Sequence, residues 1–452
     1  MKSLIEKVLI LFLFAFIFTG ENFSQTCNDC VPNQVLIELS AAGQGQLSAI
    51  ATQYKLKQNP LGQIGSPASY QMEVDTALTT QTAEQIIATM QGDGRIAKAE
   101  VNRKFSAVER ENLSWTLGQS WSIGQSWSIG GSAKGFHRQW FPETIRLDQA
   151  HNAPNGSTGK GVKVAVLDTG IDLNHPAFAG RLVAGYDFVD NDDNPSEVGA
   201  LHQNQVYGHG THVAGIIALT APDAQIMPIR VLDANGEGEL WRITAAIIWA
   251  ANNGADVINI SFGYPQNAEV LKDLLDSCDD GVTIDGRTFP ELGTRRLIVI
   301  TGAGNTGIMR TNGELMKIYP AAEDLDGMLG VGASNRYDKL TAFTSFNDPD
   351  ASGGDWVEVV APGENIVSAI PGGRYGTWSG TSMSAPIVAG IAALVKAKNP
   401  NRAPNAIAEH IKHTAPEITR YFDPLRDFEI RTQRVDAFLA VTTPVPQTPN
   451  KK

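Results

Sequence analysis

The chain has 452 residues, of which 42% are apolar, and it carries a formal net charge of −12 at pH 7. A chain of this length can bury a large core and is long enough for two or three domains. Its acidic balance, without a long basic run, argues against a nucleic-acid partner and is typical of a soluble secreted protein.

The first residues have the pattern of a targeting signal. Lys2 and Lys7 precede the uninterrupted apolar run Val8–Phe18. That run is too short to span a bilayer but has the length of a signal-peptide core, so residues 1–25 are predicted to direct secretion, extracellular or periplasmic. An uncleaved anchor is the alternative, because Thr19–Thr26 contains no clear small-x-small cleavage site. No other segment reaches transmembrane length, so we expect no membrane contact beyond the signal peptide.

Three cysteines are few for an oxidising compartment. Cys27 and Cys30 form a C-x-x-C pair, and Cys278 stands alone. Because no second Cys/His pair lies at zinc spacing, a local disulfide or an inert pair is favoured over a metal or redox site.

Residues 31–107 have the pattern of a small α+β domain. Three pieces alternate like half-buried strands, and two have helical spacing. The strand-like pieces are Val35–Leu39, Tyr70–Val74 and Ile96–Phe105, and the helical ones are Gln46–Tyr54 and Thr82–Met90.

Residues 108–136 are predicted to be a linker built around a repeat. The hexads Ser114–Gln119, Ser120–Gln125 and Ser126–Gly131 each begin with Ser-Trp. Because the period is even, the Trp and Leu/Ile side chains of an extended chain would all face one side. A flexible processing linker, which Gly and Ser favour, and a docked strand, which buries the indoles, both remain open.

From residue 137 to residue 441, buried strands alternate with helices. The apolar, β-rich runs are Val162–Leu167, Gln225–Val231, Val257–Ile260 and Leu297–Ile300, and the helical stretches include Thr211–Leu219, Trp241–Asn252 and Ser384–Ala397. Such alternation predicts a three-layer α/β/α fold with a mostly parallel sheet. The polar, Pro-rich tail, residues 442–452, is predicted to be disordered.

Three segments of this domain hold an acid, a base and a nucleophile. They are Val164–Asp172 with Asp168, Gly208–Gly215 with His209, and Gly380–Pro386 with Ser382. A serine hydroxyl becomes a strong nucleophile when an imidazole takes its proton, and a carboxylate fixes the tautomer of that imidazole. The three residues are therefore candidates for an Asp-His-Ser triad.

The chain order Asp…His…Ser and the flanking residues of these segments resemble the subtilisin-like serine peptidases. The resemblance implies a secreted serine endopeptidase that hydrolyses peptide or protein substrates and is made as a self-processing precursor. It also implies that residues 31–107 are a pro-domain that inhibits the peptidase domain of the same chain, which we expect to be a monomer. The alternative is a catalytically silent peptide-binding protein with the same fold.

A second histidine, His212, lies in the same segment as His209. In the family motif the first histidine is the base, so the resemblance implies that His212 is a packed helix residue. A metal site at the two histidines lacks a third ligand nearby, apart from Asp192 or Asp193.

The segment Gly302–Gly307, which follows the strand Leu297–Ile300, resembles the family's oxyanion segment. The resemblance implies that Asn305 donates its side-chain amide to the tetrahedral intermediate, with Gly304 contacting the substrate. Removing such a donor in a subtilisin costs about 10²–10³ in rate.

Two further segments resemble the edges between which subtilases hold a peptide as an added strand. They are Gly236, Glu237 and Gly238 on one side, and Ser261, Phe262 and Gly263 on the other. Leu240 takes the place of a pocket-lining residue, so we expect an apolar preference at the fourth non-prime position. Binding of this kind depends first on hydrogen bonds to the peptide backbone and second on the side chains. In the precursor, we expect the hexads to occupy these edges.

The acidic segment Tyr186–Pro195 resembles a calcium loop of the thermitase-like members. Asp187, Asp190 and Asp192 are the candidate ligands of a structural Ca²⁺ that would stabilise the protein modestly, because carboxylate oxygens are what Ca²⁺ prefers. An acidic turn without metal is the alternative. Ala218–Asp223 leaves no room for the second, tightly binding calcium loop of other subtilisins.

One departure from the family pattern has no functional account at this level. The segment Ser277–Gly293, which contains Cys278, is longer than the pattern leads us to expect.

Overall fold

The computed structural model describes residues 29–107, 128–201, 203–204, 206–283, 286–307, 310–311, 314–347, 355–423 and 428–446. The predicted signal peptide, Cys27, the first two hexads and the last residues of the Pro-rich tail lie outside the described residues. Within the described ranges, no helix is both long and apolar enough to cross a bilayer.

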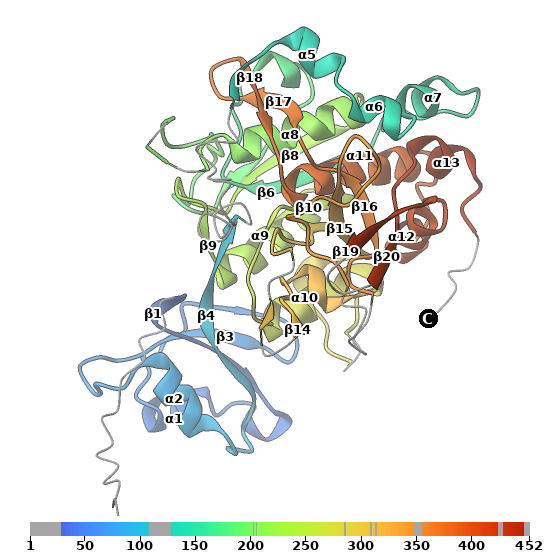
Figure 1. Cartoon of the computed structure of the whole chain (residues 1–452). Helices are drawn as coiled ribbons and strands as arrows, with labels where there is room; N and C mark the ends of the chain where they lie inside the picture. The colour runs from blue at the N-terminus through green and yellow to red at the C-terminus, as the bar shows by residue number, and fades with distance from the viewer. Residues whose placement is uncertain are drawn as a thin grey trace, which may run out of the picture.

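Residues 29–107 form an N-terminal module in which helices pack on an antiparallel sheet (Figure 1). Its elements are β1 (Cys30–Leu39), η1 (Ala41–Gly43), α1 (Leu47–Gln53), β2 (Gly62–Ile64), β3 (Ser69–Glu73), α2 (Ala83–Met90) and β4 (Ile96–Ala107). The strands pair in the order β4-β1-β3-β2. Ile50 of α1 and Ile86 of α2 are buried against Val35 and Ile37 of β1. Together they belong to a small core that is separate from that of the main domain. The module has every predicted strand and helix, and β2 in addition.

The main domain, residues 128–446, is built on a seven-stranded sheet whose strands all run parallel. The spatial order is β16-β15-β12-β10-β6-β8-β7. These strands are β6 (Lys163–Asp168), β7 (Tyr186–Asp187), β8 (Gln225–Arg230), β10 (Val257–Ile260), β12 (Ile298–Gly302), β15 (Met328–Ser334) and β16 (Val359–Pro362). Strands buried on both faces are continuous apolar runs, which is why the central ones could be found from the sequence.

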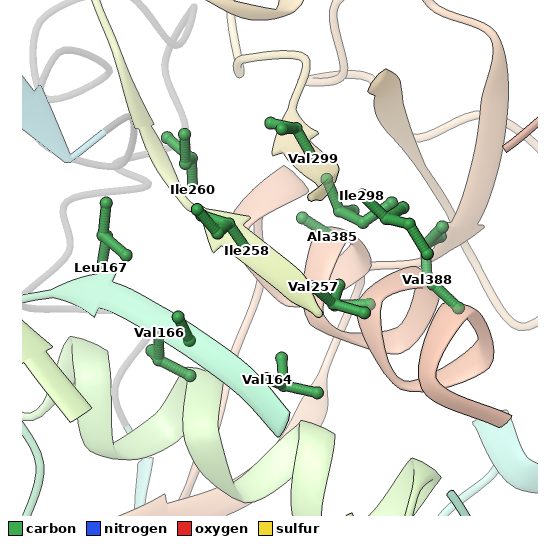
Figure 2. Packing of buried hydrophobic residues seen from close by; sticks show 14 of the residues in the cluster. Val164, Val166, Leu167, Val257, Ile258, Ile260, Ile298, Val299, Ala385 and Val388 are labelled. Atoms are coloured by element: carbon green, nitrogen blue, oxygen red, sulfur yellow. The ribbon is translucent and has the colours of Figure 1, made fainter. Parts of the chain in front are cut away.

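Helices lie on both faces of this sheet (Figure 1). On one face, α8 (His209–Thr220) and α11 (Thr381–Lys398) pack against each other, and on the other lie α9 (Leu240–Asn252) and α10 (Glu269–Asp280). Figure 2 shows side chains of α11 beside apolar residues of β6, β10 and β12. The predicted three-layer α/β/α fold is confirmed.

Shorter elements surround the three layers. They are β5 (Ser128–Gly131), α5 (Ala133–His137), α6 (Phe141–Thr144), α7 (Leu147–Asn152), η3 (Pro176–Phe178), β9 (Glu237–Glu239), β11 (Phe262–Gly263), η4 (Pro290–Leu292), β13 (Arg310–Thr311), β14 (Glu314–Leu315), η5 (Ala321–Glu323), β17 (Ile366–Ile370), β18 (Arg374–Trp378), α12 (Pro404–His413), β19 (Glu417–Asp423), β20 (Phe428–Gln433) and α13 (Ala437–Thr442).

The strand β4 belongs to both parts of the molecule. It pairs with β1 in the N-terminal module and then reaches the main domain, where its end lies between β9 and β11 (Figure 1). The pairing is antiparallel on both sides, with Lys104, Phe105 and Ser106 opposite Glu239, Gly238 and Glu237, and with Ser106 and Ala107 opposite Gly263 and Phe262.

The described end of the hexad segment docks at a different place from the predicted one. Ser128–Gly131 forms β5, which pairs antiparallel with β18. The predicted edges, Gly236–Gly238 and Ser261–Gly263, pair with the end of β4 instead. For residues 128–131 the prediction of an extended strand docked on the chain agrees with the structure, but the predicted place is wrong, because residues 104–107 already use the backbone hydrogen-bonding groups of both edges.

Candidate active site

Asp168 ends β6, so its carboxylate emerges at the carboxyl end of the parallel sheet, where the sites of α/β proteins lie. The side chain is fully buried. Its Oδ1 accepts a hydrogen bond from the Thr169 N–H at 2.7 Å and lies 2.7 Å from Nδ1 of His209. The carboxylate is therefore held from two sides.

His209 is the first residue of α8 and is fully buried. The residue before it, Gly208, has φ 91°, a left-handed conformation that favours glycine. A Cβ on Gly210 would come within 2.1 Å of the Gly170 oxygen, so glycine lets the start of the helix approach the end of β6. Because Nδ1 faces Asp168, Nε2 is the ring nitrogen that can exchange a proton with a nucleophile.

Ser382 lies in the first turn of α11 and is fully buried. Its Oγ donates to the Ser261 carbonyl oxygen at 3.1 Å. Trp378, shortly before it in the chain, places its ring against that of His209, with centroids 5.4 Å apart and planes at 87°. The ends of the neighbouring strands β6 and β10 and the starts of α8 and α11 thus meet at one buried place.

Asn305 lies in the turn that follows β12 and is 7% exposed. Its Oδ1 accepts from the Thr381 N–H at 2.9 Å, so the amide nitrogen is the end of the side chain that donates. The N–H of Gly304 donates to Thr381 Oγ1 at 3.1 Å. These bonds tie the turn to the start of α11, directly beside Ser382. Gly304 thus helps to fix this turn, and the ladders of β4 pair with Gly238 and Gly263 instead of with it.

The two predicted peptide-holding edges lie on either side of the end of β4. Beyond β9, the Ala107 N–H donates to the Gly236 oxygen at 3.0 Å. Phe105 is buried and packs edge-on against Phe262, at 6.3 Å between centroids, and against Tyr264 at 6.0 Å. Leu240, which starts α9 directly after β9, is also fully buried. The edges accept an extended strand, and the position opposite Gly238 holds a large apolar side chain.

His212 has no role in this network that would suit a base or a metal ligand. It is fully buried, and its Nε2 contacts the Ile366 carbonyl oxygen at 3.1 Å. Burial lowers its pKa to about 3, so the ring is neutral at pH 7. Among the described residues, no group of three or more His, Cys, Asp or Glu side chains could hold a metal ion, so the alternative of a metal at His209 and His212 is not supported.

The acidic turn does not fit the calcium ion that the resemblance implies. Nη1 of Arg230 lies 2.6 Å from Asp187 Oδ2 and 2.5 Å from Asp190 Oδ2. The other oxygen of Asp187 accepts from the N–H groups of Val189 and Asp190. Asp192 Oδ1 accepts from its own turn, from the Asn194 N–H. Because a guanidinium already neutralises the carboxylates of Asp187 and Asp190, the residues present do not fit the calcium ion predicted at Asp187, Asp190 and Asp192.

Sequence reasoning missed one buried acid beside the triad candidates. Both carboxylate oxygens of Glu197 accept hydrogen bonds, from Thr169 Oγ1 at 2.6 Å and from Thr211 Oγ1 at 2.8 Å. Burial raises the pKa of Glu197 to about 7, with a smaller contribution from the charge of Asp168. An isolated Glu in a loop carries no pattern that could have revealed this position.

Comparison with known proteins agrees with this geometry. The model of the subtilase family matches residues 159–438, which is more than half of the chain. A thermophilic serine proteinase of Bacillus sp. (strain AK1) is 34% identical over 352 residues, covering 76% of this chain and 73% of that protein. Thermitase of Thermoactinomyces vulgaris is 34% identical over 292 residues, covering 62% of this chain and 90% of that protein.

A solved structure extends the likeness to both parts of the molecule. Fervidolysin from Fervidobacterium pennivorans, described as a keratinolytic enzyme related to subtilisin, superposes with a TM-score of 0.66 at 23% identity. The match covers 93% of the present chain, which spans 62% of the length of fervidolysin. At this identity the likeness concerns the fold. Together with the family match, it shows that the chain belongs to the subtilase family of serine-type endopeptidases.

Proposed function

We propose that this chain is a secreted serine endopeptidase that cleaves peptide bonds through Asp168, His209 and Ser382 and is made as a precursor inhibited by its own N-terminal module. The observation that carries the proposal is the 2.7 Å contact between His209 Nδ1 and Asp168 Oδ1, buried near the first turn of α11, which contains Ser382. A monomer suffices for this function, since all the groups come from one chain.

The chemistry follows from the roles of these atoms. Ser382 Oγ attacks the substrate carbonyl while His209 Nε2 takes its proton, and His209 later returns the proton to the leaving amine. Asp168 keeps the imidazole in the right tautomer and stabilises its charged form. The side-chain amide of Asn305 donates to the oxyanion, helped by the positive end of the α11 dipole.

The position of β4 supports the proposed way of binding substrate and the proposed inhibition. Residues 104–107 lie as an antiparallel strand between β9 and β11, as a peptide substrate would. The buried ring of Phe105 supports an apolar preference at the subsite opposite Gly238, near Leu240. As long as β4 holds both edges, no other peptide can pair with them, and we infer that the N-terminal module is an intramolecular inhibitor.

The test uses the processed protein, from which the N-terminal module has been removed. A fluorophosphonate is expected to label Ser382, and casein to be hydrolysed. Ser382→Ala, which stays full-length until an added protease removes its module, abolishes both, while Asp168→Asn, processed in the same way, lowers turnover about 10⁴-fold by permitting the wrong tautomer. The matched control is Ser384→Ala, in the same turn, whose Oγ instead contacts the Ala361 oxygen.

Two results would contradict the proposal. Normal casein hydrolysis by Ser382→Ala would exclude the mechanism. Labelling of Ser382 without hydrolysis of any peptide or protein would favour the alternative, a catalytically silent peptide-binding protein with the same fold.

A further inference from the structure

The segment Ser277–Gly293, without a function so far, contains the end of α10, a short hairpin and η4. Val282 and Thr288 form an antiparallel bridge, and the Arg287 N–H donates to Thr283 Oγ1 at 2.8 Å. We name this feature the Arg287 hairpin and define it by Val282, Thr283 and Gly286–Thr288. It projects Arg287 away from the sheet of the main domain and against the N-terminal module.

The side chain of Arg287 is shared between the two parts of the molecule. It is only 4% exposed. On the side of the module, its Nη1 lies 2.8 Å from Glu38 Oε2 and its Nη2 donates to Ser69 Oγ at 2.8 Å. On the side of the main domain, Nη1 also donates to Asp273 Oδ2 of α10 at 2.9 Å. The guanidinium stacks on the ring of Phe289, 4.6 Å from its centroid, which holds its plane.

Backbone contacts surround this ion pair. The Ser66 N–H donates to the Thr288 oxygen at 2.8 Å, and the Thr288 N–H donates to the Ser66 oxygen at 3.1 Å. The Gly65 N–H donates to Glu291 Oε1 at 3.0 Å. A Cβ on Gly65, whose φ is +81°, would come within 2.7 Å of Arg287 Nη2. The loop of the module is thus shaped for the hairpin.

These contacts do not involve residues 104–107, the part of β4 that lies in the cleft between β9 and β11, although Lys98, earlier in β4, also binds Asp273 Oδ2 at 2.9 Å. Glu38 lies in β1, Gly65 and Ser66 follow β2, and Ser69 begins β3, whereas residues 104–107 of β4 hold β9 and β11. Cutting the chain after residue 107 would leave every contact of the Arg287 hairpin intact. Removing one charge of this pair while the surfaces stay together leaves the other buried without its partner, so a variant that lacks either charge should hold the module less tightly.

The geometry points to the Arg287 hairpin as a second binding surface for the N-terminal module, which keeps the module bound after the connection between the two parts is cut. The inference rests on the proposed function in taking the module as an inhibitor. The release of the module, and so the onset of activity, is then controlled by a polar contact away from residues 104–107. It also gives the segment Ser277–Gly293 a partner of defined chemistry, a surface with an acid at Glu38 and a hydroxyl at Ser69.

The experiment uses the full chain with Ser382→Ala, which cannot cut itself, and with a recognition site for a sequence-specific protease placed between residues 111 and 112. After cleavage by that protease, the main domain is held through a C-terminal tag and the release of the module into buffer is followed over time. Truncating one partner of a buried charge pair in an interface is expected to speed release about 30-fold or more in Arg287→Ala. Glu38→Gln, which leaves the main domain unchanged, should speed release in the same direction.

Two controls separate a binding role from a merely structural one. Arg295→Ala removes a neighbouring guanidinium that is exposed and contacts Asp256 within the main domain, and it should release the module at the unaltered rate. The double variant Arg287→Ala/Glu38→Gln should release the module no faster than Arg287→Ala alone, because both changes break one contact.

The inference is overturned if Arg287→Ala and Glu38→Gln both release the module as slowly as Arg295→Ala. It is also overturned if only Arg287→Ala is fast and the main domain of that variant, once separated, melts at a lower temperature, since Arg287 would then support α10 alone. Neither outcome depends on catalysis. A failure of the proposed function would instead be seen as missing turnover in the processed protein with Ser382 intact.

Discussion

The two histidines of α8 show how neighbouring atoms decide what an imidazole can do. His209 and His212 are both fully buried on the same helix. His209 has a carboxylate at its Nδ1, so a positive charge on its ring would be compensated. His212 has a backbone carbonyl and the ring of Trp378 as its neighbours, and burial keeps it neutral. Only the first can accept a proton from a nucleophile near pH 7.

Asn305 provides the first prediction at the scale of single residues. Asn305→Ala removes the donor while the start of α11 keeps its other bond to the turn, from Gly304 to Thr381. We expect kcat to fall about 10²–10³-fold with KM little changed, the size of effect known for such a donor in a subtilisin. Steady-state kinetics of the processed protein on a peptide substrate measures both constants. A change confined to KM would show that Asn305 binds the ground state instead.

Glu197 provides a prediction about pH. Its pKa in the folded protein is about 7, above the ordinary value near 4.5, so the folded state binds the proton more tightly than the unfolded state does. The stability that this group contributes is therefore complete below pH 4.5 and is lost as the pH rises through 7. Glu197→Gln, made in the Ser382→Ala chain, removes this dependence.

We compare the unfolding free energy of the Ser382→Ala chain with that of the same chain carrying Glu197→Gln. Their difference should change by about 3 kcal/mol from pH 4.5 to pH 8, at about 1.4 kcal/mol per unit of pKa. Denaturant unfolding at several pH values measures it. Glu100 and Glu323, whose pKa values burial also raises to about 7, are present in both chains and cancel in the difference. Parallel curves for the two chains would contradict the prediction.

At the scale of elements, the turn after β7 illustrates how one strand supplies the charge for another. Arg230 ends β8, and β7 pairs with β8 so that Asp187 lies directly opposite Arg230. The pairing register thus brings a guanidinium to the acidic turn. Asp187 and Arg230 are nearly fully buried, whereas Asp190 is largely exposed. The inner pair is consequently the one on which stability depends.

Replacing this guanidinium should make the chain respond to calcium. In the Ser382→Ala background, Arg230→Met leaves the buried Asp187 without a counter-charge and should lower stability by about 3–5 kcal/mol. Millimolar Ca²⁺ should then restore part of the melting temperature, since Asp187, Asp190 and Asp192 offer oxygen ligands without a competing cation. Differential scanning fluorimetry with calcium or with chelator measures this.

The unsubstituted turn and an exposed arginine are the controls. Arg295→Met should neither lose as much stability nor gain a response to calcium at this turn. The prediction fails if chelator lowers the melting temperature of the chain with Arg230 as much as that of Arg230→Met.

For the molecule as a whole, sequence patterns within one segment predicted the strand or helix that the segment forms. The continuous apolar runs at Val162–Leu167 and Val257–Ile260 correspond to β6 and β10 because a parallel strand buried on both faces needs no polar alternation. Asp168, His209 and Ser382 could be predicted as a triad because their segments and chain order resemble those of the subtilisin-like peptidases, and each lies at the end of a strand or the start of a helix.

What the sequence could not reveal depends on contacts between distant residues. Arg287 and Ser69 are 218 positions apart, and neither lies in a recognisable motif. Asp187 lies in a segment with a recognisable pattern, but Arg230, 43 positions away, does not, so the ion pair at the predicted calcium site could not be foreseen. The hexads attracted attention through their tryptophans, yet the strand in the cleft is residues 104–107, whose composition is ordinary. Pairing register, which only the folded chain defines, decided all three cases.

The last prediction concerns the cleft between β9 and β11 in the full-length chain. Because β4 is tethered beside β9 and β11, it competes with any peptide at a high effective concentration. Its main apolar anchor is Phe105, which is 1% exposed between Phe262 and Tyr264. Placing a carboxylate there should weaken the docking of β4 and open the cleft. In the full chain with Ser382→Ala, we therefore expect Phe105→Asp to raise the affinity for a fluorescent substrate peptide at least about tenfold.

Fluorescence anisotropy measures that affinity, and the module itself offers the matched control. Leu78 is an apolar residue of the same module, but it is 62% exposed, so Leu78→Asp adds the same charge without touching the cleft. Peptide binding should remain as weak in Leu78→Asp as in the parent chain. If all three chains bind the peptide equally, the end of β4 does not block the cleft, and the inhibitory role of the module must be abandoned even if the processed protein proves to be an active peptidase.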